Sequence, residues 1–272
     1  MVGLKERKWL SRLSIGVVLS FFYLPILIMI IFSFNSSKSL SSFEGFSLGW
    51  YERLFKDRDV MDAVVTSFSV AIISTLVSTI VGTITAIGLS KSRKIVKDIM
   101  LWVNDFPIMN PEIVTAIGLM LLFVFLKIEA GYLTMLLAHI TFSIPYVILS
   151  VLPKIRSLDP NLTEAALDLG ATPVQALSKV IIPQITPGII SGALIAFTMA
   201  FDDFVISYFV TGNGVKNISI LVYTMSKRIN PTINALSSIL VLVITIVLIT
   251  INVVPYIKEK GKNQNEINKE TL

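Results

Sequence analysis

Residues 153–187 read PKIRSLDPNLTEAALDLGATPVQALSKVIIPQITP and form the longest connection between apolar segments of the chain. Asp159 is a typical N-cap, and Pro160 follows it at the first helical position. Gly170 is a typical stop signal, because glycine readily adopts the left-handed conformation that ends many helices. The sequence therefore predicts a short helix between Asp159 and Gly170.

A second short helix is predicted directly after Gly170. Thr172 and Gln175 have the spacing of a capping box, and Pro183 is expected to end the helix. On the first helix, apolar residues recur at i, i+3, i+4 and i+7 and form one narrow face: Leu162, Ala165, Ala166 and Leu169. Such a face indicates either a docking site for a cytosolic partner or a helix that lies on lipid headgroups.

Outside this loop the chain is strongly apolar. Hydrophobic residues make up 54% of the 272 residues, charged residues make up only 15%, and the mean hydropathy is +0.78. Six apolar stretches are long enough to cross a bilayer as helices: residues 14–34, 63–89, 99–126, 132–152, 188–210 and 235–256. The sequence therefore predicts an all-α membrane protein with six transmembrane helices and no room for a sizeable soluble domain.

The basic residues orient these helices. Of the 23 Lys and Arg residues, 15 fall in the N-terminal segment, the second and fourth connections and the C-terminal tail, and eight fall in the other connections. Because cytoplasmic loops accumulate Lys and Arg, both termini and the 153–187 loop are predicted to lie on the cytoplasmic side of a bacterial cell membrane. The net charge of +5 follows from this bias, so we predict no binding to nucleic acid.

The residue types argue against several kinds of site. The chain has no Cys, which excludes disulfides, Cys-ligated zinc and iron–sulfur clusters. Its single histidine, His139, lies in an apolar run and is poor support for a metal site or a catalytic triad. The sequence also lacks the phosphate-binding G-x-x-x-x-G-K-[ST] loop. We therefore predict no metal, no cofactor, no enzymatic activity and no ATP hydrolysis by this chain.

The 153–187 loop resembles the EAA signature of ATP-binding-cassette importer permeases, usually EAA-x3-G-x9-I-x-L-P. The matching segments are EAALDLG at residues 164–170 and VIIP at residues 180–183, in which Val180 and Ile182 replace the usual Ile and Leu. The resemblance implies that the loop between helices 4 and 5 carries a coupling helix that inserts into an ATPase subunit. Its candidate coupling residues are Glu164, Ala165, Ala166, Asp168 and Gly170.

Two further segments resemble spermidine/putrescine permeases of the C type. They are NPEIV at residues 110–114 and DDFVISYFVTG at residues 202–212, with Asn230-Pro231 and Asn234-Ala235-Leu236 downstream. The resemblance implies a polyamine substrate, two cytosolic ATPase subunits, a second homologous permease and an extracytoplasmic solute-binding protein. A permease for another small solute is the alternative.

The resemblance also suggests how the chain is organised. We expect a cytoplasmic N-terminus at residues 1–13, and a first transmembrane helix with an outer loop at residues 14–61. An importer-type permease domain is expected at residues 62–255, followed by a disordered cytoplasmic tail at residues 256–272.

Asp202 and Asp203 lie inside the fifth apolar stretch. Each ionised Asp near a helix centre costs about 2.5 to 3.5 kcal/mol, so the pair must face a cavity, a partner or a counter-ion. On a continuous helix, Asp203 shares the face of a row of small residues: Gly188, Gly192, Ala196 and Ala200. If the second permease packs on this face, Asp203 is the better candidate for the solute path. The alternative is a structural acid that pairs with Lys or Arg near the outer mouth.

The third apolar stretch adds further candidates for the path. It contains Asp105, Asn110 and Glu112, and Pro107 and Pro111 interrupt it. Broken helices carrying polar groups are tolerated at membrane depth where protein or water surrounds them, so this segment fits a path or a gate. The alternative is an ordinary packing helix kinked by proline.

The remaining polar and aromatic residues have simpler interpretations. His139 is expected to form a hydrogen bond between helices rather than to relay protons. Tyr208 and Tyr223 are interpreted as interfacial anchors. An ion-coupled secondary carrier would explain the buried acids but would leave the EAA-like loop without a role. An intramembrane enzyme using Asp202 and Asp203 is disfavoured, because adjacent helical residues point about 100° apart.

Overall fold

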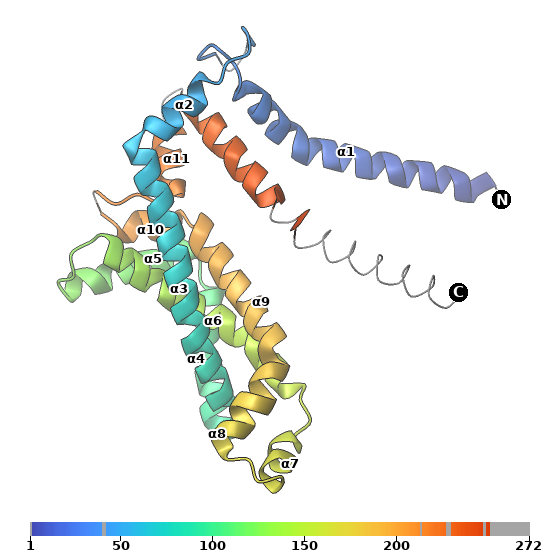
Figure 1. Ribbon diagram of the computed structural model, residues 1–272, viewed down its shortest axis with the longest axis vertical. Helices are drawn as coiled ribbons and strands as arrows, with labels where there is room; N and C mark the ends of the chain where they lie inside the picture. The colour runs from blue at the N-terminus through green and yellow to red at the C-terminus, as the bar shows by residue number, and fades with distance from the viewer. Residues whose placement is uncertain (1, 40–41, 213, 227–229, 247–248, 251–272) are drawn as a thin grey trace, which may run out of the picture. The chain divides into compact units, whose positions relative to one another are not determined.

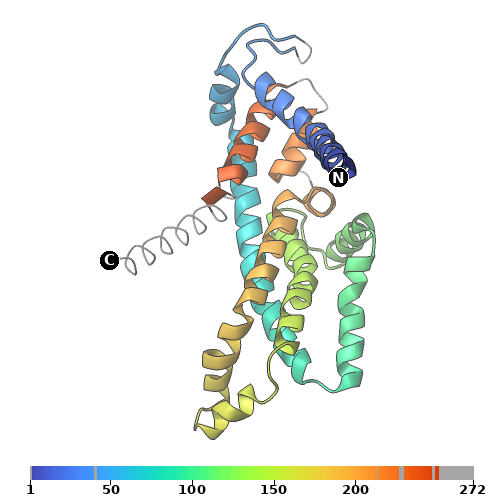
Figure 2. The same ribbon diagram turned by 90° about the vertical axis from the view of Figure 1, so that its right-hand side faces the viewer.

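The computed structural model describes residues 2–39, 42–212, 214–226, 230–246 and 249–250, and these are helical throughout apart from turns, loops and one isolated β-bridge (Figures 1 and 2). The predicted tail at residues 256–272 lies outside the described residues, as does the end of the sixth apolar stretch. The chain forms two compact units. One contains the described residues within 1–58 and 224–272, and the other contains those within 59–223.

The first unit contains α1 (Val2–Phe32), α2 (Gly49–Lys56) and a further apolar helix, Thr232–Ile246. Between α1 and α2 the chain folds around the buried side chain of Asn35, whose amide donates to the Ser42 carbonyl oxygen at 2.8 Å and accepts from Glu44 N at 2.9 Å. Trp50 Nε1 donates to the Asn35 carbonyl oxygen at 2.6 Å. The segment between α1 and α2 therefore has a defined structure.

The second unit holds most of the described helices. Its elements are α3 (Arg58–Lys91), α4 (Lys94–Met109), α5 (Glu112–Phe125), α6 (Tyr132–Arg156), α7 (Leu162–Asp168), α8 (Pro173–Ala176), the π-helical turn η1 (Leu177–Ile181), α9 (Ile182–Asp202), α10 (Val205–Val210) and α11 (Ile218–Ser226). In the part of the chain that the structure describes, four helices are long and apolar enough to cross a membrane, or five if α4 and α5 form one span. These helices fit a multi-pass membrane protein, and the count of six stays a prediction.

Helices α3, α6 and α9 pack closely because small residues meet at their contacts. A Cβ atom added to Gly82 of α3 would lie 2.7 Å from the Val147 side chain of α6, and one added to Gly192 of α9 would lie 3.1 Å from Val147 Cα. The row of small residues on α9 is buried in this way against α6. That face therefore packs within the chain and does not offer a surface to a second permease.

The EAA-like loop matches its predicted local structure except at Pro183. Gly170 has φ +84° after α7, as expected for a helix stop. Gln175 N donates to Thr172 Oγ1 at 3.3 Å, and Thr172 N donates to Gln175 Oε1 at 2.9 Å, which confirms the capping box. The prediction that Pro183 ends the helix is wrong. Pro183 is the second residue of α9, a position whose N–H has no partner within that helix, so the helical segment runs on from Pro173 to Asp202.

The third apolar stretch is broken, as its prolines suggested. Helices α4 and α5 meet at an angle of 106°. Asn110, which precedes Pro111, is extended with φ −81° and ψ 147°, because the proline ring disfavours helical backbone in the preceding residue. Pro107 lies inside α4 and does not end it. Asp105 and Glu112 therefore belong to different helices and do not share one helical face.

We predict that the substitution Gly82→Ala will lower the free energy of unfolding by about 1 to 3 kcal/mol, because the added methyl group collides with Val147. Unfolding in detergent micelles measures this effect. Gly88→Ala on the same helix is the matched control, because no atom lies within 4 Å of its added Cβ. Adding Val147→Ala should recover part of the loss. Equal stability of the Gly82 and Gly88 variants would contradict the close packing.

Candidate functional site

Asp202 and Asp203 lie at a break in the chain rather than inside one helix. Helix α9 ends at Asp202, Asp203 is extended with φ −61° and ψ 129°, and α10 begins at Val205. The prediction of a single helix over residues 188–210 is therefore wrong. The helical-wheel argument that placed Asp203 on the small-residue face also fails, because it assumed a continuous helix.

The carboxylate of Asp203 is buried and is engaged by the first turn of α10. Its side chain is only 2% exposed. Ile206 N donates to Oδ1 at 3.2 Å and Ser207 N donates to Oδ2 at 2.7 Å. A new helix leaves its first N–H groups without partners, and a carboxylate at this position supplies acceptors for them. Asp203 therefore acts as the N-terminal cap of α10.

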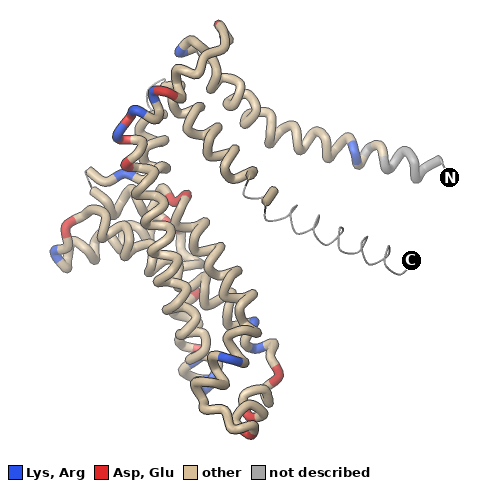
Figure 3. Tube along the Cα trace, viewed as in Figure 1, with Lys and Arg blue, Asp and Glu red and all other residues tan. Residues whose placement is uncertain are grey.

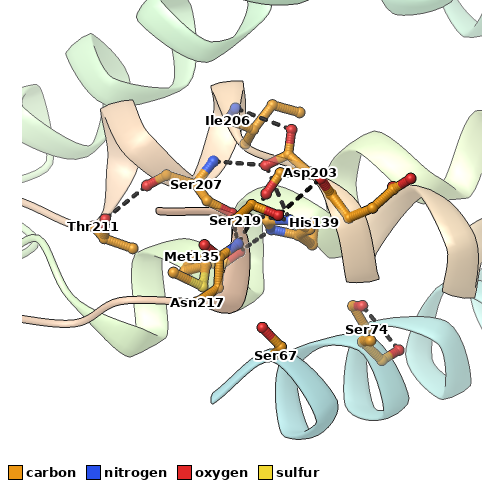
Figure 4. A network of polar contacts seen from close by, with 12 residues as sticks. Ser67, Ser74, Met135, His139, Asp203, Ile206, Ser207, Thr211, Asn217 and Ser219 are labelled. Carbon is orange, nitrogen blue, oxygen red and sulfur yellow. Dashed lines mark hydrogen bonds and ion pairs between the residues drawn. The ribbon is translucent and has the colours of Figure 1, made fainter. Parts of the chain in front are cut away.

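A polar network extends from Asp203 to α6 and to the start of α11 (Figure 4). His139 Nε2 of α6 lies 3.4 Å from Asp203 Oδ2 and 3.4 Å from Ser207 Oγ, and Nδ1 contacts the Met135 carbonyl oxygen at 2.8 Å. Because a carbonyl oxygen only accepts, Nδ1 carries a proton. Asn217 Nδ2 reaches both the Asp203 carbonyl oxygen at 2.8 Å and Ser207 Oγ at 2.9 Å. The expected role of His139 as a hydrogen-bonding residue between helices is confirmed.

Asp202 and Asp203 have different surroundings. Asp202 is exposed, whereas Asp203 is buried and paired with His139 rather than with the Lys or Arg considered from the sequence. Glu112, the first residue of α5, is partly buried and is close enough to interact electrostatically with both aspartates and with His139. The fold thus brings three candidate acids together. Of the two aspartates, Asp202 is the exposed one.

The two other candidates for the solute path, Asp105 and Asn110, lie in α4 and directly after it. Asp105 is partly buried within α4, and Asn104 Nδ2 donates to its Oδ1 at 3.3 Å. Asn110 is partly buried at the bend between α4 and α5. Along the described part of the chain, charged residues lie mainly toward the ends of the long helices (Figure 3), and Asp202 at the end of α9 and Glu112 at the start of α5 follow this pattern.

The candidate coupling residues lie at the opposite end of the second unit from α10 (Figure 1). No residue of α7 is buried, and Leu169 directly after it is 89% exposed. A cavity of about 390 Å³ lies between α7 and the ends of α3 and α6, and its lining includes Ile87, Ile155 and Leu167. Helix α7 therefore lies at the surface of the unit, and Leu169 is the most exposed of the apolar residues in and directly after it.

Sequence reasoning missed Ser207 and Asn217 as members of the network around Asp203. Asn217 stands directly before α11 and accepts from Ile220 N at 2.9 Å, so it is the N-cap of that helix. An Asn immediately before an apolar run is a recognisable cap signal. That signal predicts the start of α11, but it does not predict that the same amide reaches Asp203, fourteen residues earlier.

Comparisons with known proteins match most of the chain. Residues 78–258 match the family described as "Binding-protein-dependent transport system inner membrane component". The spermidine/putrescine transport system permease protein PotC of Haemophilus influenzae is 36% identical, covering 87% of this chain and 92% of that protein. The putrescine transport system permease protein PotI of Escherichia coli K12 is 38% identical, covering 81% and 82%.

A similarity among solved structures concerns the fold alone. A bacterial ABC transporter involved in the import of the acidic polysaccharide alginate contains a chain with a TM-score of 0.68 and 16% identity, covering 93% of this chain and 96% of that one.

The residues matched by the family, 78–258, include the whole 153–187 loop. The resemblance drawn from that loop and from the two shorter segments is therefore confirmed.

We predict that Asp203→Ala will lower the free energy of unfolding by about 1 to 3 kcal/mol, because it removes the cap of α10 and leaves buried N–H groups unpaired. Asp202→Ala is the matched control. Its side chain is exposed, so its effect should stay within about 0.5 kcal/mol. Unfolding of the two variants in detergent compares them directly, and equal losses would contradict the structural role of Asp203.

Proposed function

This chain belongs to the family of binding-protein-dependent transport system inner membrane components, and on that premise we propose that it is a permease subunit of an ATP-driven importer of polyamines. The observation that carries the substrate assignment is the exposed Asp202 carboxylate at the broken end of a membrane helix, with Glu112 nearby. PotC and PotI are named for spermidine/putrescine and putrescine transport, and these substrates share ammonium groups separated by methylene chains.

The chemistry of the site fits the transfer of organic cations. An ammonium group that leaves water needs acceptors or negative charge to replace its hydration shell. Asp202 and Glu112 supply that charge, and Asp105 and Asn110 extend the candidate path along α4 and its bend. Asp203 serves this path indirectly, because it holds α10 and so sets the position of Asp202.

The coupling role belongs to the other end of the second unit. Glu164, Ala165, Asp168 and Gly170 are exposed and Ala166 is partly so, which leaves α7 accessible to a cytosolic partner. We assign to these residues contact with an ATPase subunit. The exposed apolar side chains of Leu167, Leu169 and Val174 support docking into a protein groove.

The proposed assembly follows the family. This chain would span the membrane six times with both termini in the cytoplasm, its residues 62–255 forming the permease domain. A second permease would complete the solute path, two ATPase subunits would bind α7 and its counterpart, and an extracytoplasmic protein would deliver the solute. The bent pair of α4 and α5 would count as the third span, and the helix starting at Thr232 would lead into the sixth.

Uptake of labelled polyamine by cells that express the whole assembly tests the substrate. We expect Asp202→Asn to reduce spermidine and putrescine uptake at least tenfold at unchanged membrane levels, because the variant loses the exposed charge. Asp202→Glu should retain most of the activity. Glu129→Gln, an exposed acid in the connection between α5 and α6, is the matched control. Normal polyamine uptake by the Asp202→Asn assembly would refute the role of this acid.

Copurification tests the docking of α7. Ala165→Glu places a charge on the exposed face of α7, so the ATPase subunit should no longer copurify with the permease and uptake should be lost. Ser157→Glu, at an exposed position directly after α6, is the control and should copurify normally. Retention of the ATPase by the Ala165 variant would assign α7 to another role, such as contact with lipid headgroups.

A further inference from the structure

Three aromatic rings cluster at the break between α9 and α10. The ring centroids of Phe204 and Tyr223 are 4.7 Å apart, those of Phe204 and Tyr208 are 5.3 Å apart, and those of Tyr208 and Tyr223 are 5.9 Å apart. Tyr208 is 47% exposed and Tyr223 is 39% exposed. Each ring thus contacts both of the others, while the two tyrosines keep a large part of their surface open.

Helical spacing and one hydrogen bond bring this cluster to Asp202. Phe204 and Tyr208 are four residues apart at the start of α10, and Ser219 and Tyr223 are four residues apart on α11, so each pair shares a helix face. Ser219 Oγ donates to the Asp202 carbonyl oxygen at 3.0 Å. The end of α9 is therefore fastened to the same face of α11 that carries Tyr223.

An aromatic cluster linked to an acidic residue does not fit the interpretation of Tyr208 and Tyr223 as lipid anchors. Asp202 is exposed and its backbone is bonded to Ser219, one helical turn before Tyr223, and an ionised carboxylate in contact with lipid tails is costly. The C-terminal end of α9 adds a negative partial charge at the same place, about half an elementary charge. Negative charge beside accessible aromatic faces is the environment that attracts organic cations.

We propose that Asp202 and the exposed rings of Tyr208 and Tyr223 form a binding site for an alkylammonium group of the transported solute. This site rests on the proposed polyamine import and specifies its contacts. The carboxylate pairs with the ammonium charge, the electron-rich ring faces attract the same cation, and their apolar surface covers the adjoining methylene groups. Phe204 supports the two tyrosines, because its ring packs against both.

A series of side chains at position 208 tests the site in cells that express the complete assembly. Tyr208→Phe keeps the ring and should retain most of the spermidine uptake, whereas Tyr208→Leu and Tyr223→Leu should each reduce it about tenfold at equal amounts of assembled transporter. Tyr23→Leu on α1, where the tyrosine is 58% exposed, is the matched control and should transport normally. Uptake by the two leucine variants at the wild-type rate would overturn the site.

Fluorinated phenylalanines at position 208 separate attraction of the cation from packing. Fluorine withdraws electron density from the ring face with little change of shape, so spermidine uptake should fall stepwise with each added fluorine. Constant uptake along the series would overturn the cation-binding role even if Tyr208→Leu failed to assemble. Failure of the unmodified assembly to import polyamine would overturn the proposed function itself. If the unmodified assembly imports polyamine and the position 208 variants take up spermidine at the same rate, only this site is overturned.

Discussion

The α9–α10 break depends on how one buried carboxylate satisfies backbone N–H groups inside an apolar segment. A helix that starts anew at membrane depth exposes amide groups that lipid cannot bind. The Asp203 carboxylate accepts from two of them and lies against His139. The Asn217 side chain donates to the backbone carbonyl oxygen of Asp203. The position of Asp202, the aromatic cluster and the start of α11 all follow from this arrangement.

The sequence predicted features whose physical cause is local. The capping box at Thr172 depends on residues three apart, and the break before Pro111 depends on the ring of the next residue. The EAA-like spacing was sufficient to identify the family. In each case neighbouring residues alone determine the structure, so a pattern in the chain carries the information.

The predictions that were wrong concern segments whose structure depends on more than the local sequence pattern. A continuous helix over residues 188–210 was the natural expectation for an apolar run. The break at Asp203 is stabilised by contacts with His139, Ser207 and Asn217, and the fold rather than the local sequence brings His139 and Asn217 to it. The same break exchanges the roles expected for the two aspartates. Likewise, Pro183 suggested an end to the helix, and the π-helical turn before it was not visible in the sequence.

The uninterrupted helical segment from Pro173 to Asp202 has a mechanical consequence. At 1.5 Å per residue its 30 residues measure about 45 Å, which exceeds the thickness of the hydrocarbon core. One end begins at the turn that follows α7, and the other end carries Asp202. Under the proposed function this segment connects the ATPase-facing loop to the solute-binding carboxylate through one continuous run of helical backbone, with the π-helical turn η1 near its cytoplasmic start as the place where it can bend.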